Sequence, residues 1–182
     1  ELGAGFYYRN QPPHGERHFA AALRSIDRLT DREQLQIRAA IEGWRGNRDG
    51  AIAIRRALLV SYPDDVHAWQ RIGYDYLRAG RAREAIEAYQ QSLARDSGDA
   101  GVFINLATAY RGLRDNAAAV RHYRRAFALD SGQLLVNNIN SEFAVTLADA
   151  GRMAEAREVA SRLLHGLPDQ QAHGARTRGL LA

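Results

Sequence analysis

Apolar residues recur at intervals of three and four along most of this 182-residue chain, a spacing that places them on one face of an α-helix. Two runs show the pattern most clearly: Trp69, Ile72, Tyr76, Ile86, Tyr89 and Leu93, and then Phe103, Leu106, Tyr110, Val120, Tyr123 and Phe127. No segment shows the strict alternation, or the Asn-Gly turns, that predict a β-hairpin. The pattern therefore predicts an all-α fold.

Small residues form a second pattern, in pairs twelve positions apart that repeat at steps of 34, 34 and 37 residues. The pairs are Ala39 and Ala51, Gly73 and Ala85, Ala107 and Ala119, and Ala144 and Ala156. A glycine or polar turn lies near the middle of each pair, which predicts two antiparallel helices whose backbones approach closely at the small residues. The repeat predicts four helix pairs, at 32–65, 66–99, 100–133 and 137–170.

The second and third units resemble the tetratricopeptide repeat (TPR) family, whose signature is 34 residues long. The matching residues are Trp69, Ile72, Gly73, Tyr76, Gly80, Ala85 and Tyr89, and then Phe103, Leu106, Ala107, Tyr110, Ala119, Tyr123 and Ala126. The first and fourth units are degenerate, because Arg38 and Arg55 stand at apolar positions and Asn140 at an aromatic one. The resemblance implies a right-handed α-α superhelical solenoid of about four TPR helix pairs, of bacterial type.

The flanking segments are interpreted as covers for this array, because an unstacked repeat exposes an apolar face. Residues 1–31 are predicted to be a loop, rich in Gly and Pro up to residue 15, followed by a capping helix over 16–29. Thr30 and Glu33 predict a capping box that opens the next helix. Three extra residues within 133–139 predict nearly one additional helical turn, and residues 171–182 are predicted to be a C-terminal tail, either frayed or a short capping helix.

Composition excludes several classes of chemistry. The chain has no cysteine, and all 25 of its basic residues are arginine, so disulfides, thiol nucleophiles and lysine-dependent phosphate loops are ruled out. With 21 acidic residues the net charge is a modest +4. No apolar run is long enough to span a membrane. Because the first residue is Glu1 rather than Met, we expect a piece of a larger protein, and we expect it to be cytoplasmic.

Candidate catalytic and metal-binding residues are scarce. His14 and His18 have the i, i+4 spacing of metal ligands on a helix, but Pro12 and Gly15 argue against a helix there and no third ligand is evident. Serines and histidines follow no nucleophile-elbow pattern, and the paired carboxylates are explained by helix capping and by pairing with nearby arginines. We therefore expect a protein that is not an enzyme and holds no cofactor or metal.

The densest basic run is Arg121, Arg124 and Arg125, with Arg111 and Arg114 upstream. We interpret it as a solvated convex face. Contact with nucleic-acid phosphates, or with an acidic protein or lipid surface, is the alternative, although the run is short and lacks exposed aromatic residues for base stacking. Nucleic acid is therefore not the partner that we expect.

The TPR resemblance implies that the first helix of every unit lines a concave groove. The partner-binding residues that it implies are Trp44 in the first unit, Gln70, Arg71, Tyr74 and Arg78 in the second, Asn105, Thr108 and Arg111 in the third, and Asn138 and Glu142 in the fourth. Helical spacing agrees, because Arg71, Tyr74 and Arg78 share a stripe separate from the apolar seam. Arginine and tyrosine are also common at binding hot spots.

These observations predict a non-catalytic protein-protein interaction scaffold that binds a peptide or helical segment of acidic character in its groove. The alternative is a regulatory or self-association segment of a larger bacterial signalling protein, such as a kinase, a cyclase or a transcription regulator. Ile37, Ile41 and Trp44 form an apolar stripe on the first unit, which residues 1–29 cover or a partner contacts. A homodimer through this unit stays open.

Overall fold

A computed structural model describes residues 12–131, 137–164, 177 and 179 of the chain. This part contains nine α-helices, one short 3-10 helix and no strand, so the predicted all-α fold is confirmed. The helices are α2 (Pro12–Arg24), η1 (Ile26–Arg28), α3 (Asp31–Trp44), α4 (Arg48–Ser61), α5 (Val66–Arg78), α6 (Ala82–Leu93), α7 (Ala100–Gly112), α8 (Asn116–Leu129), α9 (Asn137–Asp149) and α10 (Met153–Leu164).

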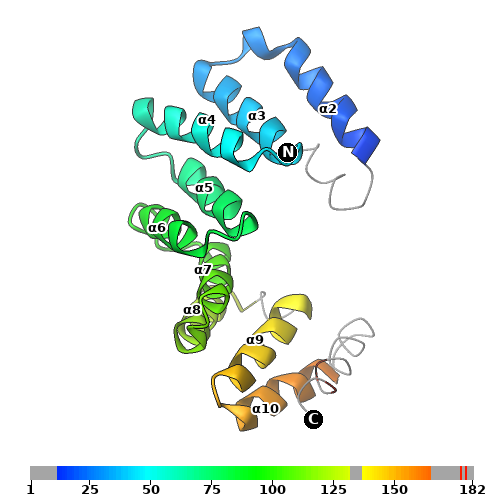
Figure 1. Cartoon of the computed structure of the whole chain (residues 1–182), viewed down its shortest axis with the longest axis vertical. Coiled ribbons are helices and arrows are strands. Elements are labelled where there is room, and N and C mark those ends of the chain that lie inside the picture. The colour runs from blue at the N-terminus through cyan, green and yellow to red at the C-terminus, as the bar shows by residue number, and fades with distance from the viewer. Residues whose placement is uncertain (1–11, 132–136, 165–176, 178, 180–182) are drawn as a thin grey trace.

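Helices α3 to α10 pack as four antiparallel pairs, α3 with α4, α5 with α6, α7 with α8, and α9 with α10. Contacts of α4 with α5, α6 with α7, and α8 with α9 join each pair to the next. The result is a curved stack, with α2 at one end and α10 at the other (Figure 1). The prediction of four helix pairs is confirmed.

The predicted small residues lie at the helix crossings and are buried. The seven alanines at these positions are completely inaccessible to solvent: Ala39, Ala51, Ala85, Ala107, Ala119, Ala144 and Ala156. Gly73 is the tightest crossing, because a Cβ atom built on it would lie 2.7 Å from Cε1 of Tyr89. The backbone of α5 therefore rests directly on the Tyr89 ring of α6, and no side chain fits between them.

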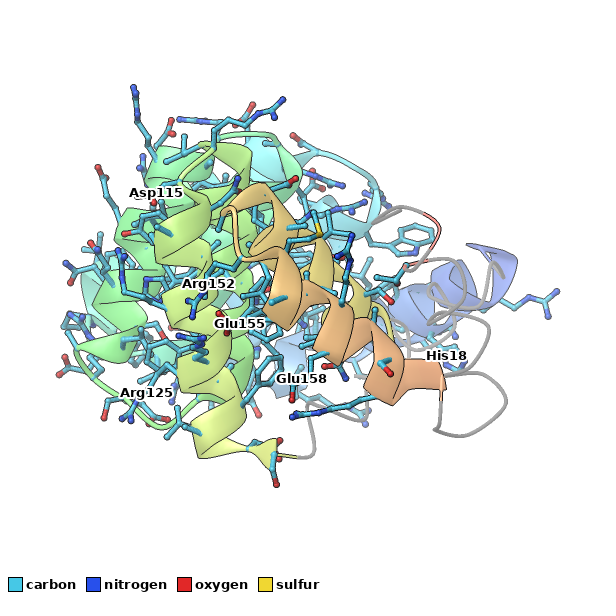
Figure 2. The ribbon with its side chains drawn as sticks, turned by 90° about the horizontal axis from the view of Figure 1, so that it is seen from below. His18, Asp115, Arg125, Arg152, Glu155 and Glu158 are labelled. Carbon is cyan, nitrogen blue, oxygen red and sulfur yellow. The ribbon has the colours of Figure 1, made fainter. Side chains whose placement is uncertain are left out.

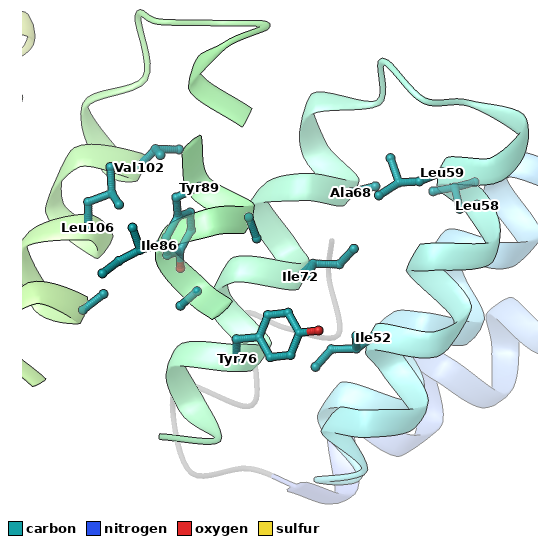
Figure 3. Close-up of a cluster of buried hydrophobic side chains, with 13 residues drawn as sticks. Ile52, Leu58, Leu59, Ala68, Ile72, Tyr76, Ile86, Tyr89, Val102 and Leu106 are labelled. Atoms are coloured by element: carbon teal, nitrogen blue, oxygen red, sulfur yellow. The ribbon is translucent and has the colours of Figure 1, made fainter. Parts of the chain in front are cut away.

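Apolar residues of successive helices form a core that runs through the stack. Figure 3 shows its first half, in which Ile52 of α4, Ile72 and Tyr76 of α5, Tyr89 of α6 and Leu106 of α7 lie in one cluster. A second cluster continues from α7 to α10. The apolar stripes predicted from the sequence are thus the packing seams between helices.

Local signals fix where helices begin. Thr30 and Glu33 form the predicted capping box: the Glu33 N–H donates to Thr30 Oγ1 and the Thr30 N–H donates to the Glu33 carboxylate. Side chains cap four more helices, each accepting backbone N–H bonds from the first turn: Asn47, Asp65, Asp99 and Asp115. These caps set the helix boundaries within each unit.

The start of the first helix was predicted wrongly. Helix α2 begins at Pro12, so residues 12–15 are helical and not part of a loop. Proline is tolerated in the first turn of a helix, where its missing N–H would have no partner in any case. Residues 1–11, the predicted extra turn before α9 and most of the predicted 171–182 tail lie outside the described residues.

Arg55, which occupies an apolar position of the repeat pattern, forms a buried ion pair. It is only 7% exposed on α4, and its guanidinium donates to the carboxylate of Asp75 on α5, which is 5% exposed. Burial raises the pKa of Asp75, although Arg55, Arg48 and Arg71 offset part of this shift, and burial lowers the pKa of Arg55. Both directions indicate that burying these charges costs more than their mutual attraction returns.

The crossing at Gly73 predicts that Gly73→Ala destabilises the protein by about 1–3 kcal/mol, the usual cost of overpacking a core. Thermal unfolding followed by circular dichroism measures this effect. Gly112→Ala is the matched control, since its new methyl group would meet Ala82 Cβ at an ordinary 3.7 Å. Equal melting temperatures for the two variants would contradict the crossing geometry.

The buried pair predicts strong coupling between Arg55 and Asp75. Asp75→Ala leaves a buried, unpartnered guanidinium and should cost about 3–5 kcal/mol, whereas Arg55→Met with Asp75→Ala should cost less than that single change. Urea unfolding of the two single variants and the double variant measures the coupling free energy. Additive effects of the two substitutions would show that the charges do not interact.

Candidate partner-binding groove

A cavity of about 1250 Å³ opens on the side of the stack formed by the first helices of the first two units. Helices α3 and α5 form its main wall, residues of α4 extend the wall, and α2 stands opposite. Four consecutive α-helices therefore supply its lining, so the cavity lies at the N-terminal end of the stack.

Four of the ten groove residues predicted from the sequence line this cavity. Trp44 lies at the end of α3, and Arg71, Tyr74 and Arg78 follow one another along a single face of α5. The i, i+3, i+7 spacing predicted that these three residues share a face, and the structure places all three against the same cavity.

The charged groups around the cavity are unequal in number, with four arginines and one aspartate. Asp75 is paired with Arg55, so the positive charges of Arg48, Arg71 and Arg78 are in excess. Within the described part of the chain the guanidinium groups of these three arginines form no salt bridge and no hydrogen bond. Their guanidinium groups are therefore available to a negatively charged ligand.

His67, on the cavity wall, adds little to this positive charge at neutral pH. Desolvation of the ring is the main factor that lowers the pKa of His67 on the cavity wall, and the nearby Arg71 lowers it further. The imidazole of His67 is therefore mainly neutral at pH 7.

Another part of the cavity lining is apolar. The rings of Phe19 on α2 and Trp44 on α3 lie 5.3 Å apart, and Ile37 lies on the same wall. Of the predicted apolar stripe, Ile41 is buried, whereas Ile37 and Trp44 are only half-buried and border the cavity. The cavity thus joins an aromatic wall to a basic one.

The side chain of Gln70 forms a hydrogen bond to the next unit of this chain. Its amide Nε2 donates to Asp99, the N-cap of α7, at 2.8 Å, and Gln36 one unit earlier donates to Asp65, the N-cap of α5, at 3.3 Å. The two glutamines link the first helix of one unit to the first helix of the next. The corresponding position of the third unit is Ile104, which has no side-chain donor.

Asn105, Thr108, Arg111 and Glu142 do not border this cavity, and two of them pair with each other. Arg111 Nη1 donates to Glu142 Oε2 at 3.1 Å, Tyr123 donates its hydroxyl to the same oxygen, and Thr108 donates to the backbone of its own helix. Asn105 is half-buried on α7, and the side chain of Asn138 lies outside the described residues. The charges of Arg111 and Glu142 are thus mutually neutralised.

The basic run on α8 does not form a single charged patch. Arg124 pairs with Glu155 of α10 at 2.6 Å, and Arg152 pairs with the same carboxylate. Figure 2 shows Arg152 and Glu155 close together beside α8. Arg125 lies 6.0 Å from the centre of the Phe103 ring. Arg124 and Arg125 thus make contacts within this protein.

Sequence reasoning missed the contributions of α2 and α4 to the site. Phe19 and Ala22 of α2 and Arg48 and Arg55 of α4 all border the cavity. The apolar stripe of α2 was recognised, but its spacing does not say whether the helix packs tightly or stands apart. Arg55 was noted only as an exception to the repeat pattern.

Two further searches of the described residues gave negative results. They contain no group of three or more side chains that could hold a metal ion. None of their helices is long and apolar enough to cross a membrane. Helix α2 includes the positions of both His14 and His18, but the side chain of His14 lies outside the described residues.

Comparisons with solved structures show the same fold. The chain is similar to the crystal structure of TTC0263, a thermophilic TPR protein of Thermus thermophilus, with 18% identity, a TM-score of 0.75 and coverage of 97% of this chain and 95% of that one. It is also similar to a crystal structure of MamA, with 20% identity, a TM-score of 0.70 and coverage of 79% and 81%. MamA 41-end from Desulfovibrio magneticus RS-1 matches with 16% identity, a TM-score of 0.70 and coverage of 90% of each chain.

A search of curated protein sequences gave no match to this chain. The family model for the tetratricopeptide repeat matches residues 45–100 and 104–171, which together make up more than half of the chain. These two regions hold most of the stacked helix pairs, with their right-handed superhelical arrangement. On this evidence the chain belongs to the tetratricopeptide repeat family.

Proposed function

We propose that this protein is a non-catalytic scaffold that binds an acidic segment of a partner protein in its groove. The TPR fold supports a protein-protein interaction role. The observation that carries the acidic specificity is the excess of Arg48, Arg71 and Arg78 around the cavity, with the single aspartate already paired. Guanidinium groups bind carboxylates with paired, directional hydrogen bonds.

The rigidity of the wall supports this proposal. Helices α3 and α5 are fixed by their crossings with α4 and α6 and by the bonds of Gln36 and Gln70 to the caps of the next unit. A preformed wall loses little conformational entropy when a partner binds, so more of the contact energy appears as affinity.

Of the ten groove residues predicted from the sequence, we assign the principal contacts to Trp44, Arg71, Tyr74 and Arg78. Gln70 acts as a link between units, and the paired Arg111 and Glu142 shape the groove without adding net charge. Asn105, Thr108 and Asn138 remain candidate contacts for a segment that extends beyond the cavity.

Reversing the charge of two cavity arginines tests the proposal. The Arg71→Glu, Arg78→Glu double variant should raise the Kd for a fluorescein-labelled peptide of mixed Glu, Asp and Tyr at least about tenfold, a loss of about 1.4 kcal/mol. Fluorescence anisotropy measures the binding. The same peptide with Gln and Asn in place of its acids should bind weakly to the wild-type protein.

The matched control is the Arg83→Glu, Arg121→Glu variant, which changes the net charge equally at exposed positions away from the cavity. It should bind the acidic peptide within about twofold of the wild type, apart from a general effect that salt screens. Equal losses in both double variants would show that net charge, and not the groove, attracts the peptide. Circular dichroism confirms that each variant is folded.

A further inference from the structure

Helix α2 stands apart from the repeats, although the sequence predicted that it covers them. Ile26 in η1 is buried and fixes one end of the segment, and the Phe19–Trp44 ring contact holds α2 to the end of α3. Between these contacts the cavity separates α2 from α3 and α5. Helix α2 therefore forms the fourth wall of a pocket.

The size of the pocket favours a polypeptide over a metabolite. Sites for small molecules usually measure about 300–1,000 Å³, and this cavity measures about 1250 Å³. A helix about 10 Å wide with a 5.4 Å pitch occupies roughly 420 Å³ per turn, so the cavity has room for about three turns. About ten residues of a partner would occupy it.

The apolar wall favours a helix over an extended segment. An extended backbone against Phe19 and Ile37 would lose its hydrogen bonds to water, because these side chains have no group that replaces them. Gln36, the polar neighbour on α3, already donates to Asp65. A helix satisfies its own backbone groups, so it can enter such a pocket without that loss.

The two walls define the chemistry of the occupant. Phe19, Ile37 and Trp44 would contact apolar side chains, whereas Arg48, Arg71 and Arg78 would attract carboxylates. Residues spaced three and four apart on a helix can meet one wall while the acids on its neighbouring face meet the other. A uniformly acidic segment would leave the aromatic wall without a partner.

We propose that the pocket between α2 and α5 receives about three turns of an acidic amphipathic helix from a partner protein, with α2 as one wall of the binding site. This inference rests on the proposed function and goes further, because it specifies the conformation of the partner segment and its apolar anchor. It also assigns binding contacts to Phe19 and Ala22 of α2.

Two labelled peptides of identical composition test the helical register. Both contain about twelve residues, leucines and glutamates. In the first, called the ordered peptide, the leucines fall three and four apart on a single helical face. In the second, called the scattered peptide, the leucines are distributed around the helix. The wild-type chain should bind the ordered peptide at least about tenfold more tightly than the scattered one. Fluorescence anisotropy at low and high salt measures both affinities.

A matched pair of α2 variants tests the fourth wall. Ala22→Glu places an acid on the cavity face of α2, and Ala20→Glu makes the same change at an exposed position that does not border the cavity. Ala22→Glu should weaken binding of the ordered peptide at least about tenfold, and Ala20→Glu less than about twofold. In a Trp69→Phe background, Trp44 is the only tryptophan, and its emission should shift to the blue when the ordered peptide binds.

The possible outcomes separate this inference from the proposed function. If both peptides bind equally and Ala22→Glu has no effect, while Arg71→Glu with Arg78→Glu abolishes binding, the helical pocket is wrong but the acidic groove stands. If neither peptide binds, both proposals fail. If the chain dimerises in sedimentation experiments and Ala22→Glu abolishes the dimer, the occupant is a second copy, and the inference of a separate partner is overturned.

Discussion

Each helix pair depends on a crossing at which there is no room for a large side chain. The alanines at these crossings are completely buried, and at Gly73 even one added carbon would collide with the Tyr89 ring. Because the same contact recurs in every unit, the first helices face one side of the stack in succession. The alignment of Arg71, Tyr74 and Arg78 on the groove wall follows from this packing.

The chain neutralises many of its own arginines, and this decides where a partner can bind. Arg111 pairs with Glu142 and Arg124 with Glu155, so the third and fourth units hold their charges in contacts between units. Among the described residues, Asp75 is the only acid that borders the cavity at the first two units, and it pairs with Arg55. A modest net charge of +4 is thus compatible with a strongly basic pocket at one end.

Local patterns predicted the features that local physics controls. The spacing of apolar and small residues predicted the helix pairs, and the Thr30–Glu33 signature predicted a capping box. Contacts between units could not be predicted from local patterns. Arg111 and Glu142 are 31 residues apart, and their pairing depends on how two units stack. The distance of α2 from the repeats could not be predicted, because an amphipathic stripe identifies the apolar face of a helix but not its distance from the next element.

The position of α2 is the part of the account that a distance measurement tests most directly. The chain has no cysteine, so Arg17→Cys on α2 and Arg83→Cys on α6 would place spin labels at two exposed positions. Pulsed electron paramagnetic resonance should give one narrow distance distribution, similar in width to that of an Arg83→Cys, Arg121→Cys reference pair within the stack. A broad or multiple distribution for the α2 pair alone would contradict a preformed pocket.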